Sequence, residues 1–244
     1  MKIIERPSPN FNERVGVSGP DILIMHYTGM QSCEAAVTRL TDPASRVSSH
    51  YTVDEDGTVY RHVDEAMRGW HAGVSHWRGA SDINSRSLGI EIVNPGHEFG
   101  YRAFPDVQIA AVLALGQAIV ARHAIPARNV IGHSDIAPGR KTDPGELFPW
   151  KHLALAGLGL WVEAKGAQDA SLMRPDTGAR VGELQRLLVR YGYGLEVTGV
   201  YDEPTEIVVG AFQRHFRPAR FDGVADAETL AILRALNATL DAVA

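Results

Sequence analysis

The stretch DILIMHYTG (residues 21–29) decides the fold of the N-terminal part of this chain. An apolar run rich in β-forming residues and closed by Gly29 is typical of a buried strand. Further along, SSHYTVDEDGTVYRHV (48–63) contains two alternating segments on either side of Asp56-Gly57, which predicts a β-hairpin. We therefore expect a β-sheet domain that includes both stretches.

Strand and helix patterns alternate after the hairpin. SLGIEIVNPG (87–96) and NVIGHSD (129–135) each predict a short strand, whereas DVQIAAVLALGQAIVARHA (106–124) has apolar residues at helical spacing. WKHLALAGLGLWVEA (150–164) predicts a last helix that packs against this domain. The alternation is typical of the α/β class, here with a central mixed β-sheet flanked by helices.

The C-terminal part of the chain has a different pattern. KGAQDASLMRPDTGA (165–179) is poor in large apolar residues and rich in turn formers, so we expect a linker at 165–176. Three helical segments follow it: RVGELQRLLVRYGY (180–193), EPTEIVVGAFQRHF (203–216) and DAETLAILRALNATLDAV (226–243). These segments predict a small all-α three-helix domain.

Two of these helices have recognisable starts. Pro204 suits a first helical turn after Asp202, and Asp226 is a predicted N-cap. With the linker between them, we expect the domains to cover residues 1–164 and 177–244.

Composition limits the partners and cofactors of this chain. The net charge of -5 comes without a basic run or stripe, so nucleic acid and anionic membranes are poor candidate partners. Cys33 is the only cysteine, which excludes an intrachain disulfide and a thiolate metal cluster. Any metal must therefore be bound by histidine and carboxylate side chains.

The compartment is predicted from what the sequence lacks. MKIIERPSPNFNERVG (1–16) has no apolar segment after a basic start, and no later apolar run is long enough to span a bilayer. The chain as written is therefore expected in the cytoplasm, or in the periplasm if a signal segment was removed. The sequence gives no indication of the oligomeric state.

A loop rich in glycine and proline, IGHSDIAPGRKTDPG (131–145), concentrates ionisable groups. His133 follows a predicted strand, as His26 does, and Asp143 lies near the end of the loop. Two histidines and a carboxylate leave a fourth position open for water, which is typical of a catalytic zinc site. The alternative is that the histidines are satisfied core groups and that Asp143 forms a turn.

Further polar residues could act beside such a metal. Glu91, flanked by apolar residues in a strand, is either solvated or a buried group suited to general-base catalysis. If residues 141–143 are extended, Lys141 and Asp143 project to the same side, where the ammonium would face a developing oxyanion. Trp70 and His71 either pack in the core or form the rim of a cleft.

Four segments in order carry a family resemblance: MHYTG (25–29), SSHYTVDEDGTVYRHVDEAMRGWHAG (48–73), NSRSLGIEIVNPG (84–96) and VIGHSDIAPGRKTDPG (130–145). Together they resemble the type 2 N-acetylmuramoyl-L-alanine amidases, which share their fold with peptidoglycan recognition proteins and amidase-type phage lysozymes. The resemblance covers roughly residues 20–150. It implies that His26, His133 and Asp143 bind Zn²⁺, that Glu91 is the catalytic carboxylate and that Lys141 stabilises the transition state.

The implied reaction is hydrolysis of the amide between N-acetylmuramic acid and L-alanine in peptidoglycan or in muropeptides, including the anhydro-muropeptides of bacterial cell-wall recycling. The predicted substrate contacts are Trp70, His71, Asn84, Arg86 and Arg140, the last three as polar anchors. The C-terminal segments resemble the three-helix peptidoglycan-binding domain found beside cell-wall hydrolases; the alternative is a structural brace. Two other functions stay open: a non-catalytic peptidoglycan receptor, and a zinc peptidase that cuts within the stem peptide.

Overall fold

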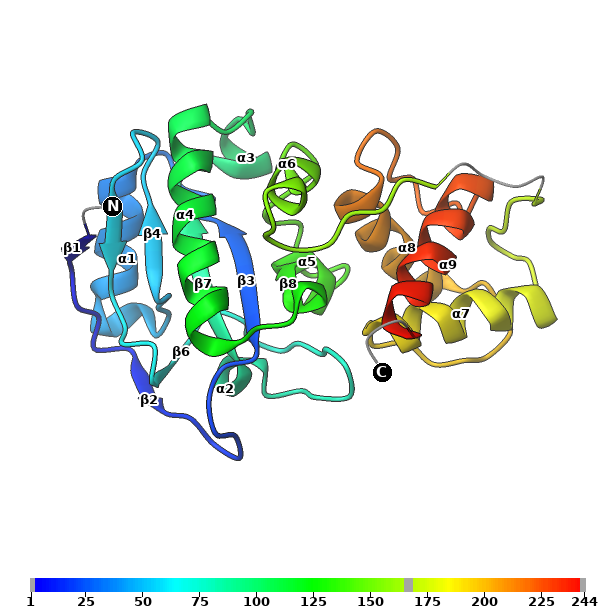
Figure 1. Ribbon diagram of the computed structural model, residues 1–244, viewed down its shortest axis with the longest axis horizontal. Helices are drawn as coiled ribbons and strands as arrows, with labels where there is room; N and C mark the ends of the chain where they lie inside the picture. The colour runs from blue at the N-terminus through cyan, green and yellow to red at the C-terminus, as the bar shows by residue number, and fades with distance from the viewer. Residues whose placement is uncertain (1–2, 165–168, 242–244) are drawn as a thin grey trace. The chain divides into compact units, whose positions relative to one another are not determined.

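The computed structural model describes residues 3–164 and 169–241, which form two compact units. The first unit comprises Met1–Ser75, Asp82–His133 and Asp143–Leu160. The second comprises His76–Ser81, Ser134–Thr142 and Trp161–Ala244. Two short segments that lie within the predicted domain 1–164 therefore group with the C-terminal helices (Figure 1).

The first unit is built on a mixed β-sheet, as expected for the α/β class. Its strands, in spatial order, are β1 (Ile3–Glu5), β5 (Val59–Arg61), β4 (Tyr51–Val53), β7 (Ser87–Ile92), β3 (Ile22–Tyr27) and β8 (Val130–Gly132). Neighbouring strands are parallel except β5 and β4, which are antiparallel. These two strands form the predicted hairpin, whose turn closes through Asp54 N–H donating to Thr58 O at 2.8 Å.

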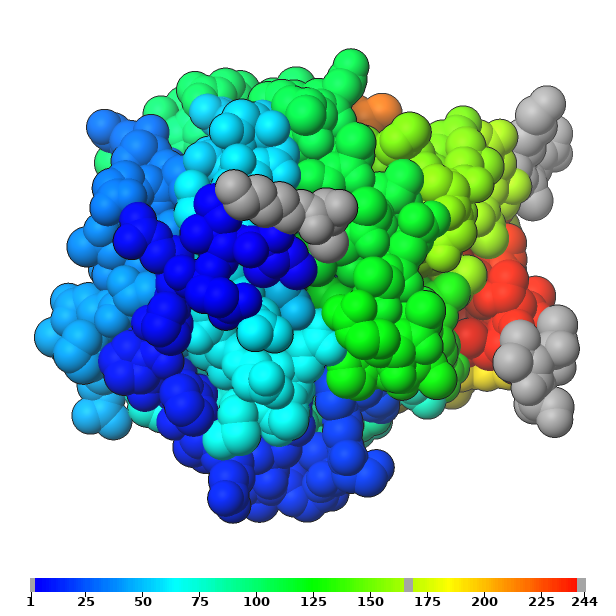
Figure 2. Space-filling view, turned by 60° about the vertical axis from the view of Figure 1, so that its left-hand side comes forward, coloured from blue at the N-terminus to red at the C-terminus, as the bar shows by residue number. Residues whose placement is uncertain are grey.

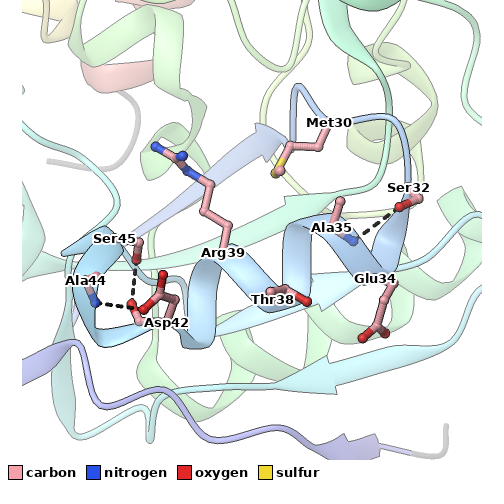
Figure 3. Close-up of a pocket in the computed structure, with 9 residues that line it drawn as sticks. All are labelled: Met30, Ser32, Glu34, Ala35, Thr38, Arg39, Asp42, Ala44 and Ser45. Atoms are coloured by element: carbon pink, nitrogen blue, oxygen red, sulfur yellow. Dashed lines mark hydrogen bonds between the residues drawn. The ribbon is translucent and has the colours of Figure 1, made fainter.

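Strand β3, which lies between β7 and the edge strand β8, is buried on both faces. Its residues from Ile22 to Met25 are fully shielded from solvent. Helix α1 (Cys33–Thr41) covers one face of the sheet, and α4 (Asp106–His123) covers the other (Figures 1 and 3). Coverage on both faces explains why the sequence of β3 is a continuous apolar run and does not alternate.

Short elements complete the first unit. They are an antiparallel pair, β2 (Phe11–Glu13) with β6 (Met67–Gly69), and the helices η1 (Pro43–Ser45), α2 (Ile83–Arg86), α3 (Gly96–Phe99), η2 (Ala127–Asn129) and α6 (Trp150–Leu155). A further short helix, α5 (His133–Ile136), starts directly after β8. The prediction of one helix over 150–164 is wrong, because the helix ends at Leu155. Gly157 and Gly159 then adopt φ values of +86° and +93°, which a helix cannot contain.

The second unit contains the three predicted helices, α7 (Ala179–Tyr191), α8 (Glu203–Phe216) and α9 (Ala227–Asp241). The carboxylate of Asp202 accepts a hydrogen bond from Thr205 N at 3.0 Å, and Asp226 caps α9 in the same way at 2.9 Å. Both predicted helix starts are thus confirmed. Residues 165–168 of the expected linker and 242–243 of the last predicted helix lie outside the described residues.

A buried carboxylate organises the core of the second unit. Asp135 accepts a hydrogen bond from the Tyr193 hydroxyl at 2.6 Å and lies 2.7 Å from His215 Nδ1. Burial raises the pKa of Tyr193 well above its ordinary value, and the charge of Asp135 raises it further, so the phenol stays a donor. Trp77 packs edge-on against Tyr193, with ring centroids 5.2 Å apart. Segments 76–81 and 134–142 are therefore part of this core.

In the first unit, Glu65 joins strand β4 to the end of helix α4. Its carboxylate accepts hydrogen bonds from Tyr51 Oη at 2.7 Å and from Arg122 Nη2 at 2.6 Å, and His123 Nε2 lies 2.6 Å away. Burial raises the pKa of Glu65, but the hydrogen bonds from Arg122, His123 and Tyr51 outweigh it and lower the pKa to about 2. The ionised form therefore stabilises the fold.

We expect Glu65→Gln to reduce the acid sensitivity of the first unit. The folded pKa of about 2 lies below the ordinary value of 4.5, so the stabilisation is complete above pH 4.5 and is lost as the pH falls toward 2. The wild-type protein should lose up to about 3 kcal/mol of unfolding free energy over this range. Urea denaturation at several pH values measures the loss, and exposed Glu98→Gln is the control. Identical pH profiles for wild type and Glu65→Gln would contradict the expectation.

Candidate metal centre

Strand register brings three predicted site residues to one edge of the sheet. In the parallel pair β3 and β7, His26 lies opposite Glu91, so both side chains project from the same face. In the parallel pair β3 and β8, Met25 lies opposite Gly132, so His133 follows at the level of His26. The carboxyl ends of neighbouring parallel strands are where binding sites of α/β proteins form. Because these strands are adjacent, their parallel pairing gathers residues that lie far apart in the sequence.

Three ligand atoms converge at this edge. His26 Nδ1 and His133 Nδ1 lie 3.0 Å apart, and each lies 3.0 Å from Asp143 Oδ2. All three side chains are buried. Ligands of a tetrahedral zinc ion are about 3.3 Å from one another when the metal–nitrogen distance is 2.0–2.1 Å.

The chemistry of these atoms also fits a cation. Two imidazole nitrogens and a carboxylate oxygen all carry lone pairs, and a metal ion attracts all three at once. Burial raises the pKa of Asp143, but the charge and hydrogen bond of His133 and those of His26 outweigh it, so the net pKa is lowered far below its ordinary value. Asp143 is therefore ionised and gives the group one negative charge. This donor set suits a divalent metal such as zinc.

Tyr101 holds the loop that carries Asp143. Its hydroxyl donates a hydrogen bond to Pro144 O at 2.8 Å and accepts one from Leu147 N at 3.0 Å. Gly145, with φ of +86°, lies so close to this hydroxyl that a Cβ would collide with it. The glycine and proline of this stretch thus allow the loop to pack against Tyr101, and this packing fixes the position of the Asp143 carboxylate.

The outward-facing ring nitrogens of both histidines also have partners. His26 Nε2 lies 3.0 Å from His71 Nδ1, and His133 Nε2 donates a hydrogen bond to Ala72 O at 3.0 Å. Burial lowers the pKa of His71 well below its ordinary value, and the neighbouring histidines lower it further, so its ring is neutral. These partners leave the two Nδ1 atoms to face Asp143.

Two of the predicted substrate contacts lie in the interior. His71 is only 9% exposed and lies behind His26, which differs from a position on an exposed cleft rim. Asn84 is equally buried, and its Oδ1 accepts hydrogen bonds from the backbone N–H groups of His71 and Ala72. The sequence could not reveal these interior positions, because they depend on where the main chain of residues 71–72 lies relative to Asn84.

The other predicted site residues lie in varied surroundings. Trp70 is half-buried and donates from Nε1 to Asn12 Oδ1 at 2.7 Å, while Arg86 forms an ion pair with Asp21. Arg140 and Lys141 belong to the second unit. There Lys141 lines a pocket with residues of α8 and the 221–223 turn.

The surface of the first unit has a shallow groove along α1 (Figure 3). Nine residues line it: Met30, Ser32, Glu34, Ala35, Thr38, Arg39, Asp42, Ala44 and Ser45. None of them is a predicted site residue, and Ser32 and Asp42 are engaged in capping helices α1 and η1. The chemistry is therefore assigned to the buried ligand group and not to this groove.

Two family models match the chain. One, described as N-acetylmuramoyl-L-alanine amidase, matches residues 17–146, and the other, described as a putative peptidoglycan binding domain, matches residues 177–233. The first match covers all residues of the ligand group.

Two relatives resemble most of the chain. The N-acetylmuramoyl-L-alanine amidase AmiD of Escherichia coli K12 is 40% identical over 228 residues, which cover 88% of this chain and 81% of the relative. The structure of E. coli AmiD in complex with anhydro-N-acetylmuramic acid-L-Ala-D-gamma-Glu-L-Lys has a TM-score of 0.78 at 37% identity and covers 94% of this chain and 98% of that one. AmpDH3 of Pseudomonas aeruginosa has a TM-score of 0.77 at 33% identity, with coverages of 93% and 95%.

A shorter relative matches a smaller share of the chain. The 1,6-anhydro-N-acetylmuramyl-L-alanine amidase AmpD of Citrobacter freundii is 33% identical over 161 residues, which cover 59% of this chain and 84% of the relative.

We expect His133→Ala to remove metal binding from an otherwise folded protein. Loss of one of three protein ligands should lower zinc affinity by more than about 100-fold, measured by competition with a chromophoric chelator. His62→Ala is a matched control, because His62 is equally buried but hydrogen-bonds to Thr52 and to the Arg6 carbonyl. Wild-type affinity in His133→Ala would show that the metal binds elsewhere.

Proposed function

This chain belongs to the N-acetylmuramoyl-L-alanine amidase family, and we propose that its His26, His133 and Asp143 hold the zinc ion on which hydrolysis depends. The reaction cleaves the amide between N-acetylmuramic acid and L-alanine. The observation that carries the proposal is the convergence of three buried ligand atoms, each 3.0 Å from the other two. When bound, zinc lowers the pKa of a water molecule to about 7 and polarises a carbonyl group.

Glu91 is the proposed general base and acid. It lies opposite His26 in the sheet register and is half-buried, so its side chain projects from the same face of the sheet as the His26 ligand. In this position it accepts a proton from the attacking water and delivers it to the leaving amine of L-alanine. Proton transfer of this kind typically contributes about 10²–10⁴-fold to the rate.

Lys141 is proposed to stabilise the oxyanion, on the strength of the family resemblance. One such donor is worth about 2.7–4 kcal/mol in other hydrolases. Arg140, which is exposed, and Trp70 are proposed contacts for the glycopeptide. Arg86 is a weaker candidate than the sequence indicated, because Asp21 already occupies its guanidinium.

The substrate class follows from the relatives. The AmiD complex contains an anhydro-muramyl peptide, and the AmpD relatives are named for the anhydro-muramyl amide. We propose that this chain acts on muropeptides of the same class, including anhydro-muropeptides, and that residues 177–233 bind peptidoglycan. Membership of a hydrolase family, together with a complete ligand group, favours an enzyme over a receptor.

The compartment stays a prediction. No helix within residues 3–164 or 169–241 is long and apolar enough to cross a membrane. The cytoplasm was predicted from the sequence, with the periplasm as the alternative if a signal segment was removed. Cell fractionation with an antibody to the chain distinguishes the two.

Product analysis tests the proposed reaction. We expect wild-type protein to release the intact stem peptide, with L-alanine at its amino end, from a soluble anhydro-muropeptide. Zinc-stripped protein should be inactive until metal is restored. Glu91→Gln should lower kcat by about 10²–10⁴-fold while keeping its zinc, and Glu55→Gln, a half-buried control whose carboxylate pairs with Arg102, should keep full activity.

Mass spectrometry separates the outcomes. Alanine left on the sugar would identify a stem-peptide hydrolase and overturn the amidase proposal. Intact substrate with folded, zinc-loaded wild-type protein would indicate a receptor. Full activity of Glu91→Gln would remove Glu91 from the mechanism and leave the amidase assignment in place.

A further inference from the structure

We propose that the turn Trp70–Gly73, fastened by Asn84, positions both histidine ligands of the metal site. The turn supplies one acceptor from a side chain, His71 Nδ1, and one from the main chain, Ala72 O. The inference rests on the proposed metal site. It makes His71 and Asn84 positioning residues, in place of the substrate contacts that the sequence predicted.

The first link runs through His26. A neutral imidazole carries one ring proton, so when Nδ1 is a metal ligand the proton is on Nε2. That N–H then donates to His71 Nδ1, 3.0 Å away. His71 Nε2 in turn lies 3.4 Å from Ser87 Oγ, whose hydroxyl donates to Ile83 O at 2.7 Å. In this series of hydrogen bonds, every donor points away from the ligand group. A single tautomer of each ring, with its proton on Nε2, is therefore consistent with all of these contacts.

The second link runs through His133. Its Nε2 donates to Ala72 O at 3.0 Å, which again leaves Nδ1 as the ligand atom. Metal-binding histidines usually donate their other ring N–H to a carboxylate, a carbonyl or water, and this orients the ring. Here consecutive residues provide both acceptors. A displacement of the turn would therefore misalign both ligands together.

Asn84 fixes the position of the turn. Its Oδ1 accepts hydrogen bonds from His71 N at 3.1 Å and from Ala72 N at 2.8 Å. Asn84 itself lies on the short helix α2, whose start is capped by Asp82 through hydrogen bonds to Ser85. The side chain is thus attached to a defined element and buried against the turn that it holds.

The His71 ring packs against Gly89, where the absence of a side chain leaves room for it. A Cβ on Gly89, in the middle of β7, would lie 2.7 Å from His71 Nδ1. On its other sides the ring contacts His26 at a centroid distance of 5.1 Å and His50 at 5.5 Å, both edge-on. With neighbours on these sides, the ring has little freedom to turn its acceptor away from His26.

The competing explanation is that His71 only fills space in the core. Substitutions that differ in the acceptor separate the two. His71→Leu keeps an apolar volume and removes the acceptor, whereas His71→Asn places an amide oxygen near the position of Nδ1. Two readouts are needed: zinc affinity by chelator competition, and the visible absorption spectrum of the Co²⁺-substituted protein, which reports ligand geometry. Unfolding free energy is measured on every metal-free variant.

We expect His71→Leu to lower zinc affinity by about 10- to 100-fold and to change the Co²⁺ spectrum, and His71→Asn to recover most of both. Asn84→Leu should weaken zinc binding in the same range, and Asn84→Asp, which keeps an acceptor oxygen, should recover it. His62→Leu is the matched control: His62 is a buried histidine whose ring nitrogens face Thr52 Oγ1 at 2.8 Å and Arg6 O at 2.8 Å. It should lower stability and leave zinc affinity unchanged.

Equal losses of zinc affinity in His71→Leu and His62→Leu, or no recovery in His71→Asn, would overturn the proposal in favour of a space-filling role. Unchanged affinity and spectrum in His71→Leu would overturn it as well. Failure of the proposed function has different signatures: wild-type protein that binds no zinc at this site, or zinc-loaded wild-type protein that leaves the substrate intact.

Discussion

The negative charge of Asp143, buried next to two imidazole rings, is the constraint on which the site depends. An ionised carboxylate removed from water is costly unless a positive charge or hydrogen bonds compensate it. A divalent ion held by His26, His133 and Asp143 together would supply that compensation. The two histidines can share such an ion with Asp143 because their adjacent parallel strands end at the same level, as the pairing of Met25 with Gly132 sets them. The strand order β7-β3-β8 and the loop held by Tyr101 meet this requirement.

The metal ligands are accompanied by further polar side chains in the interior of the first unit. The rings of His26, His71 and His50 contact one another in series, and this is possible because Gly89 and Gly69 leave room where side chains would collide. Arg14 adjoins the last ring and donates hydrogen bonds to main-chain carbonyls, including Ser85 O at 2.8 Å. Burial lowers the pKa of Arg14 to about 10, which leaves it charged at neutral pH. Polar side chains thus replace apolar packing along this path, and each has a partner.

Local patterns in the sequence predicted what depends on local physics. Strand β3, the hairpin at Asp56-Gly57 and the helix starts at Asp202 and Asp226 all follow from neighbouring residues. The end of the helix at Leu155 could not be predicted in this way, because the apolar spacing continues past it, through glycines whose backbone is not helical. The position of His71 depends on Gly89 and Asn84, which are distant in sequence, so a Trp-His pair alone could not distinguish a cleft rim from the interior.

The identity of the group behind His26 has a consequence for the charge of the site. A carboxylate in the place of His71 would add a second negative charge, whereas a neutral imidazole adds none and still accepts the hydrogen bond. With a carbonyl behind His133, the three ligands and the groups hydrogen-bonded behind the histidines contribute one negative charge, from Asp143. A divalent ion held by this set therefore keeps a net positive charge. That charge is what polarising an amide carbonyl and stabilising an oxyanion require, so the partners of the ligands favour hydrolysis over a purely structural metal.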